Sequence, residues 1–297
     1  MLARARARQA VERHERHAAK AMMVRSPLLP SEFSPLLPSA SNQVLSFYLN
    51  LESRSDRRSQ MEAMLSARRL RAQRVPAATV RDAEVLCMAR AHPGKATGYL
   101  ANLASHTSVW ERVAAQEDTS LALIFEDDVL LHRDWWALLH ASLCAIAKKG
   151  TGVGSDSGDT GIVRSDMGSS AFDCLLLDGL YITGETSAER GWLGPDTEGV
   201  HAADGVAFSS AYALTPAAAR WLLDRRAARP GSSTEAYLMQ LQEERRATWT
   251  CLPRLALQRW DEAVSSVSGS AGCGSMRGWY EKNYFPRWPW ALYAEGL

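Results

Sequence analysis

The sequence has almost no net charge, and it lacks any long apolar run. Lys and Arg number 34 against 33 Asp and Glu, which gives a formal net charge of +1. A general nucleic-acid binder presents an excess of basic residues, so we predict no nucleic-acid partner. A transmembrane helix needs roughly 18 consecutive apolar residues. No such stretch is present, so we also predict no transmembrane segment.

Cysteine is scarce, and its spacing excludes the common cysteine motifs. There are five cysteines, an odd number, and none stands in a CxxC pair. A zinc ribbon and a thioredoxin-type site are therefore both unsupported. We interpret the cysteines as reduced and mostly buried thiols, which favours a reducing compartment. They are Cys87, Cys144, Cys174, Cys251 and Cys273.

The N-terminus lacks the apolar segment of a secretory signal peptide. Residues 1–25 contain seven Lys or Arg and two Glu. A solvated basic helix or tail accounts for this composition, and an organelle transit peptide is the alternative. We therefore predict a cytoplasmic location.

The composition is that of a globular protein, with 46% hydrophobic and 23% charged residues among 297. These proportions exclude a wholly disordered chain and a collagen-like repeat. Residues 1–42 are basic, and the pentapeptide Ser-Pro-Leu-Leu-Pro occurs twice in them, so they predict a flexible tail or linker. Residues 43–262 form the main domain, with a flexible Gly- and Ser-rich insertion at 150–170. Residues 263–297 form an aromatic-rich C-terminal extension.

Strand patterns alternate with helix patterns along the main domain. Apolar runs bounded by polar residues predict strands, and apolar residues at three-to-four spacing predict helices. The alternation predicts an α/β domain with a mostly parallel central sheet flanked by helices. We expect strands at 44–49, 74–80, 121–125, 174–177, 208–214 and 247–252, helices at 59–71, 98–116, 134–149, 216–226 and 234–246, and a loop at 50–58.

Three consecutive acids, Glu126, Asp127 and Asp128, follow the apolar strand at 121–125. Ligands of open α/β sheets bind beyond the carboxyl ends of the strands. Adjacent carboxylates there repel one another and cost desolvation, and a hard divalent cation relieves both problems. The acids therefore predict a Mg²⁺ or Mn²⁺ site. The alternative is a solvated turn with a helix cap.

Two further polar segments are candidates for ligand binding. The loop that follows the first strand carries Arg54, Arg57 and Arg58, and arginine binds phosphate oxygens bidentately. The alternative is a solvated loop that enters a helix, with Ser55 or Asp56 as its cap. Ser105 and His106 lie in the helix at 98–116, where a lone histidine is commonly structural.

Taken in order, these segments resemble glycosyltransferase family 25. That family includes bacterial lipopolysaccharide-core glycosyltransferases and relatives of procollagen galactosyltransferases. Residues 49–58 are similar to its opening motif, which commonly reads Ile-Asn-Leu-Asp-Arg-x-x-Asp-Arg-Arg. Residues 105–110 are similar to its Ser-His-x-x-x-Trp segment, and residues 126–128 to its acidic motif. Residues 172–177 and 211–223 resemble later segments, so the resemblance covers about residues 44–260.

The resemblance implies a GT-A-like nucleotide-sugar-binding fold and a UDP-sugar donor. It also implies a divalent metal, Mn²⁺ or Mg²⁺, and inverting transfer of a hexose, often galactose or glucose, to a hydroxyl of a glycan or protein acceptor. Asp127 and Asp128 would hold the metal. The catalytic base would be Glu235 or Asp204, with His106 a weaker candidate. The nucleotide-sugar-binding residues would be Asn50, Arg54, Asp56, Arg57, Arg58, Ser105 and His106.

One segment departs from the family pattern. The family usually has Gly-Glu-x-Gly-Cys before the Ser-His pair, and this chain has Gly-Tyr-Leu-Ala-Asn at 98–102. A carboxylate is thus replaced by Tyr99. The departure leaves open a catalytically inactive GT-A-like domain that serves as a binding or scaffold module. A metal-dependent nucleotidyltransferase or phosphohydrolase is a third hypothesis.

Overall fold

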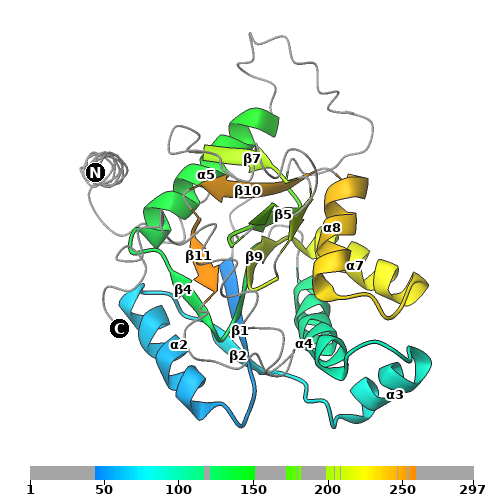
Figure 1. The fold of residues 1–297 in the computed structure, drawn as a ribbon. Coiled ribbons are helices and arrows are strands. Elements are labelled where there is room, and N and C mark those ends of the chain that lie inside the picture. The colour runs from blue at the N-terminus through cyan, green and yellow to red at the C-terminus, as the bar shows by residue number, and fades with distance from the viewer. Residues whose placement is uncertain are drawn as a thin grey trace, which may run out of the picture.

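A computed structural model describes most of the central part of the chain (Figure 1). The described residues are 44–116, 121–150, 172–178, 180–181, 199–203, 205–207, 209–245, 247–252 and 254–258. The predicted tail at 1–42, nearly all of the insertion at 150–170 and the extension at 263–297 lie outside them.

A seven-stranded sheet forms the centre of the molecule, with the strand order β2-β1-β3-β9-β5-β10-β7. The pairing directions leave five strands running one way, with β9 and β7 running the other way. The mixed α/β architecture and the mostly parallel sheet are therefore as predicted. The strands are β1 Val44–Asn50, β2 Gln73–Pro76, β3 Leu121–Glu126, β5 Cys174–Leu176, β7 Gly199–Ala202, β9 Ala211–Leu214 and β10 Thr248–Leu252.

Two short antiparallel pairs accompany the central sheet. β4 (Val129–Leu131) pairs with β11 (Ala256–Gln258), and β6 (Leu180–Tyr181) pairs with β8 (Val206–Ala207). The first pair matters for the site, because it brings residue 258 next to the segment that follows β3.

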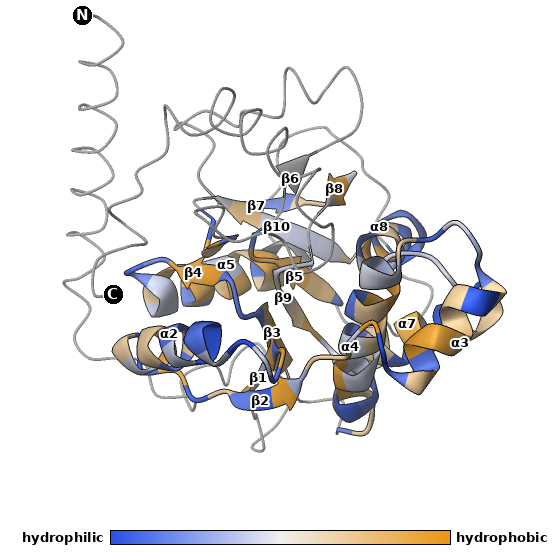
Figure 2. Ribbon diagram, turned by 60° about the horizontal axis from the view of Figure 1, so that its bottom comes forward, coloured by the Kyte–Doolittle hydropathy of each residue, from blue (hydrophilic) through white to orange (hydrophobic). Residues whose placement is uncertain are grey.

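Helices cover both faces of the sheet (Figure 2). α2 (Ser55–Ala67) and α5 (Trp135–Gly150) pack on one face, and α4 (Thr97–Ala114), α7 (Pro216–Ala228) and α8 (Thr234–Arg245) pack on the other. α3 (Ala83–Ala91) packs against α4. Among the helices that the structure describes, none has the length and apolar character that a membrane crossing requires.

The strand β3 shows why the sheet has a core on each side. Successive side chains of a strand point to opposite faces. Leu121, Leu123 and Phe125 accordingly join the core under α2 and α5, whereas Ala122 and Ile124 join the core under α4, α7 and α8. All five are buried, which explains the continuous apolar run in the sequence.

The predicted ends of the first helix, α2, were wrong. The loop expected at 50–58 ends at Arg54, because α2 begins at Ser55, and the helix expected at 59–71 ends at Ala67. The buried residues of α2 include Met61, Met64 and Leu65, but the same face continues through Arg57. A charged residue at a buried helical position hid the first turn from an argument based on apolar spacing.

The predicted elements lie close to their observed positions, although β2 already ends at Pro76 and β9 begins only at Ala211. The sequence argument missed α3 and five short strands, β4, β6, β7, β8 and β11. The helix α7 begins as expected, with Pro216 as its first residue and the Thr215 hydroxyl accepting a hydrogen bond from Ala218 N. Pro76 lies in β2 at the edge of the sheet, where its missing N–H is tolerated.

Candidate active site

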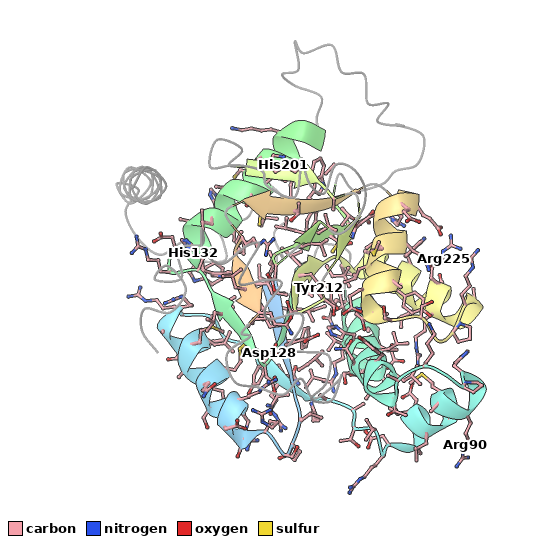
Figure 3. The ribbon with its side chains drawn as sticks, viewed as in Figure 1. Arg90, Asp128, His132, His201, Tyr212 and Arg225 are labelled. Atoms are coloured by element: carbon pink, nitrogen blue, oxygen red, sulfur yellow. The ribbon has the colours of Figure 1, made fainter. Side chains whose placement is uncertain are left out.

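The site forms where the parallel strands β1 and β3 end side by side. Their register pairs Leu49 with Glu126, so the residues that follow each strand are neighbours. Asn50 Nδ2 donates a hydrogen bond to Asp127 Oδ2 at 2.7 Å. Figure 3 shows the adjacent Asp128 near the middle of the molecule, between α2 and α4.

Arg57 bridges two of the acids. It lies in the first turn of α2, and its Nη1 is 3.1 Å from Asp127 Oδ1 and 3.2 Å from Asp128 Oδ2. The Arg57 side chain is only 9% exposed, so these ion pairs are poorly screened by solvent. The early start of α2, which the alternative with a cap at Ser55 or Asp56 anticipated more closely than the predicted helix at 59–71, therefore places this arginine beside the acids.

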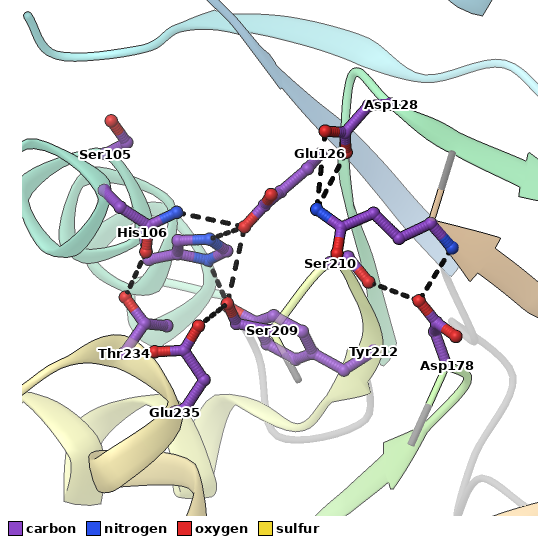
Figure 4. A network of polar contacts seen from close by, with 12 residues as sticks. Ser105, His106, Glu126, Asp128, Asp178, Ser209, Ser210, Tyr212, Thr234 and Glu235 are labelled. Carbon is purple, nitrogen blue, oxygen red and sulfur yellow. Dashed lines mark hydrogen bonds and ion pairs between the residues drawn. The ribbon is translucent and has the colours of Figure 1, made fainter. Parts of the chain in front are cut away.

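Glu126 points to the opposite side of the strand from Asp127. It continues the alternation of Ala122 and Ile124, which face α4. Its Oε1 lies 3.0 Å from Asn102 Nδ2, 3.2 Å from His106 Nε2 and 3.4 Å from Ser209 Oγ (Figure 4). The acidic triplet thus divides between two sets of partners on the two sides of β3.

A buried ring network supports the α4 side of the site. The Tyr212 hydroxyl lies 2.8 Å from His106 Nδ1 and accepts a 2.8 Å hydrogen bond from Trp110 Nε1. All three side chains have essentially no exposed surface. When His106 carries its hydrogen on Nε2, it donates to Glu126 and accepts from Tyr212, so every polar atom of this network is satisfied.

The acids have unequal electrostatic environments. Burial, followed by the charge of Glu126, raises the pKa of Asp128 to about 7, although Arg57 opposes this shift. Burial also raises the pKa of Asp127, against the effects of Asn50 and Arg57. Burial acts in the same direction on Glu126, but hydrogen bonds from His106 and its other partners leave its pKa lowered. Negative charge at Asp128 is therefore undercompensated.

A pocket of about 250 Å³ opens above the three acids. Its walls come from the ends of β1 and β3, from the 77–80 loop and from the first half of α4. Its lining includes Leu49, Leu51, Ser53, Arg57, Ala77, Ala78, Thr79, Val80, Gly98, Ala101, Asn102, Ser105, Glu126, Asp127, Asp128 and Gln258.

The structure separates the predicted nucleotide-sugar residues. Arg57 and Ser105 line the pocket, whereas Asn50 is not part of the lining and contacts Asp127, which is. Arg54 instead forms a two-bond pair with Asp56, at 2.9 and 2.7 Å, and Arg58 lies 3.7 Å from Glu52. His106 is fully buried behind Glu126. These positions do not test the predicted roles.

The structure places only one of the two predicted catalytic bases. Glu235, in the first turn of α8, has its Oε1 3.1 Å from Ser209 Oγ, and it does not line the pocket. Ser209 thus connects Glu235 to Glu126. Asp204 lies outside the described residues. Both assignments stay predictions.

Sequence reasoning missed three residues that shape the site. Asn102 lines the pocket and bonds Glu126, and it stands four residues before His106, so helical spacing could have placed it on the same face. Gln258, at the end of β11, has its Nε2 3.4 Å from Asp128 Oδ2, and no pattern in the neighbouring sequence indicates this contact. Arg74 bonds Asn50 Oδ1 at 3.0 Å from the neighbouring strand. In the segment at 98–102, which departs from the family pattern, Tyr99 is 47% exposed.

A buried carboxyl behind the site makes a test of these electrostatics possible. Asp178 is 3% exposed, and its Oδ2 accepts hydrogen bonds from Ser210 Oγ at 2.6 Å and from Gln258 N at 2.9 Å. Burial raises its pKa to about 6 from an ordinary value of 3.8. The folded protein therefore binds more protons than the unfolded chain between these pH values, so Asp178 costs stability as the pH rises through them.

Replacing Asp178 by asparagine should stabilise the fold at high pH. The change removes the cost of ionising a buried group, so the free energy of unfolding should rise by about 2–3 kcal/mol at pH 8. The gain should shrink toward zero at pH 4, where the native carboxyl is already protonated. Urea unfolding at both pH values measures it, and a variant that is less stable at pH 8 would contradict the assignment.

Comparison with known proteins identifies the family of this chain. The model of glycosyltransferase family 25, described as LPS biosynthesis protein, matches residues 45–230. The match includes all of β3, nearly all of β1 and all three acids, but not β10 or β11. A search of the curated proteins found no match. Because the family match spans well over half of the sequence, the chain belongs to glycosyltransferase family 25, and this membership implies that it is a glycosyltransferase.

Proposed function

We propose that the protein transfers a hexose, galactose or glucose, from a UDP-sugar to a hydroxyl of a glycan or protein acceptor, with inversion. The observation that carries the proposal is the pocket above Glu126, Asp127 and Asp128. It lies at the carboxyl ends of β1 and β3, where open α/β sheets bind ligands. Its polar floor of three carboxylates, with Asn102 and Ser105 also in its lining, suits a ligand that combines phosphates with hydroxyl groups.

The floor of the pocket fits a divalent cation that is completed by the donor. In the described part of the chain, no three His, Cys, Asp or Glu side chains are grouped to hold a metal by themselves. Asp127 and Asp128 supply two carboxylates, and Mg²⁺-type ions bound to one or two carboxylates usually take phosphate oxygens and water as well. The undercompensated charge of Asp128 favours such an ion. The bound cation would neutralise charge on the departing UDP.

Residues around the acids would fix their geometry. Arg74 holds Asn50, and Asn50 in turn holds Asp127, so one carboxylate is oriented from the edge of the sheet. Arg57 offsets part of the charge of the acid pair while no donor is bound. Inversion requires a base for the proton of the acceptor hydroxyl, and Glu235 and Asp204 stay the predicted candidates.

The second candidate is a catalytically inactive domain of the same fold. Its specific support is that Arg57 already contacts both Asp127 and Asp128, so an internal cation occupies part of the space where a metal would lie. The altered segment at 98–102 also favours this candidate. Asn102 of this segment lines the pocket, and the carboxylate that the family usually has in the segment is replaced by the exposed Tyr99.

Location stays a prediction from composition. The described cysteines, Cys87, Cys144, Cys174 and Cys251, are all free thiols. Unpaired thiols support a reducing compartment and hence the predicted cytoplasmic location.

Thermal unfolding with nucleotides separates the two candidates. Purified protein is heated with UDP, GDP or CDP, each with and without Mn²⁺. A ligand at one hundred times its Kd adds about 2.7 kcal/mol of stability, which is readily measured as a rise in Tm. We expect the rise only with UDP and Mn²⁺ together, followed by release of UDP from a UDP-hexose. Binding without any transfer would favour the inactive domain, and release of phosphate or pyrophosphate would favour phosphoryl chemistry.

A further inference from the structure

The two carboxylate oxygens of Glu126 have different surroundings. Three hydrogen-bonding groups converge on Oε1, from Asn102, His106 and Ser209 (Figure 4). Within the described part of the chain, no protein group bonds Oε2. The side chain is 18% exposed and lines the pocket. One oxygen is therefore anchored in the protein, and the other remains available to a ligand.

The anchors are themselves fixed. His106 is held by the Tyr212 hydroxyl at 2.8 Å, and Asn102 Oδ1 accepts a 2.7 Å hydrogen bond from Thr234 Oγ1. His106 is fully buried. A side chain whose partners are locked by their own contacts keeps one orientation, which is how binding sites become preorganised. Glu126 is therefore held apart from Asp127 and Asp128, on the α4 side of β3.

We propose that Glu126 binds a hydroxyl group of the donor sugar and is not a metal ligand. This inference rests on the proposed function, since it assumes a nucleotide-sugar in the pocket. Among the described residues, Glu126, Asp127 and Asp128 do not form a group of three that could hold one metal ion together. In its observed position it adjoins the acids that would meet the diphosphate. The diphosphate is flanked by the ribose and by the donor sugar, and a carboxylate oxygen is a strong acceptor for hydroxyl groups. Because UDP carries the ribose but not the donor sugar, a comparison of UDP with UDP-hexose separates these two partners.

The change Glu126→Gln tests this with little disturbance to the fold. The amide oxygen can still accept hydrogen bonds from Asn102 and His106, so the NH₂ group takes the place of Oε2. The atom that faces the ligand then changes from an acceptor to a donor. The matched control is Glu111→Gln, the same chemical change at an exposed position of α4.

Binding is measured by calorimetry in the absence of acceptor, with Mn²⁺ present, for UDP, UDP-galactose and UDP-glucose. We expect Glu126→Gln to raise the Kd for the UDP-hexose that the unmodified protein binds. The increase should be about tenfold or more, the value of a hydrogen bond to a charged group. The Kd for UDP should change less than about twofold, and the Mn²⁺ concentration needed for half-maximal UDP binding should stay the same. Glu111→Gln should match the unmodified protein throughout.

Each other outcome overturns the inference in a recognisable way. Equal weakening of UDP and UDP-hexose would place Glu126 at the ribose or the phosphates, and a higher Mn²⁺ requirement would make it part of the metal site. Unchanged UDP-hexose affinity would show that Glu126 does not bind the donor sugar. If the unmodified protein binds no nucleotide at all, the proposed function fails and this inference fails with it. Circular dichroism of Glu126→Gln shows whether a loss of binding is a loss of fold. If this variant does not fold, Glu126→Asp takes its place: it keeps the charge but has a shorter side chain, so it should weaken UDP-hexose binding.

Discussion

Asp128→Asn should reduce sugar transfer by about a thousandfold while leaving the protein folded. A metal that assists a leaving phosphate contributes several kcal/mol to the transition state, and each 1.36 kcal/mol is a factor of ten in rate. Asp128 lies on the floor of the pocket, and its charge is the one least compensated by neighbours. Initial rates of UDP release from the active UDP-hexose, at saturating Mn²⁺, measure the effect.

The same substitution should not destabilise the protein at pH 8. Burial raises the pKa of Asp128 to about 7, above its ordinary value of 3.8, so its ionisation costs stability as the pH rises from about 4 to about 7, and the full cost is present at pH 8. Removing this charge should leave the Tm equal to or above that of the unmodified protein. The control Asp224→Asn, at an exposed position of α7, should change neither property. Normal Mn²⁺-dependent transfer by Asp128→Asn would rule out the proposed site.

Trp110→Ala should have the largest effect on stability, about 3–5 kcal/mol in the free energy of unfolding. Trp110 has no exposed surface, and it packs edge-on against Tyr237 with ring centroids 6.2 Å apart. Its indole N–H also bonds the Tyr212 hydroxyl at 2.8 Å. The alanine variant loses both the packing and the hydrogen bond, and it leaves a cavity between α4 and the sheet. Urea unfolding monitored by circular dichroism measures the loss.

Trp110→Phe separates the two contributions. Phenylalanine keeps most of the packing but cannot donate to Tyr212, so it should cost about 1–2 kcal/mol, close to the value of one hydrogen bond plus a small volume change. Tyr99→Ala, on the same helix but 47% exposed, should change stability by less than about 0.5 kcal/mol. A loss below 1 kcal/mol in Trp110→Ala would show that α4 is not packed against β9 as described.

The motif Ser-His-x-x-x-Trp shows which contacts local sequence can predict and which it cannot. His106 and Trp110 are four residues apart, so helical geometry places both on one face of α4. That they both contact Tyr212 could not be inferred, because Tyr212 lies more than one hundred residues later, on β9. This strand lies antiparallel between β3 and β5, a position set by nonlocal pairing.

The sequence by itself determined the α/β class, most of the elements and the presence of acids at the end of β3. These follow from local patterns: apolar periodicity, the Thr215-Pro216 helix start and the abrupt change from apolar to acidic residues after Phe125. Such patterns act over a few residues, so they can be read without knowing what packs beside them.

The tertiary structure alone decided how the acids are used. Strand alternation sends Glu126 toward α4, and Arg57 reaches Asp127 and Asp128 only because the first turn of α2 lies beside β3. Gln258 reaches Asp128 through the pairing of β11 with β4. A side chain's direction depends on which partners the fold places around it, and those partners come from segments 20 to about 130 residues away. For that reason adjacent residues of one acidic triplet have different surroundings.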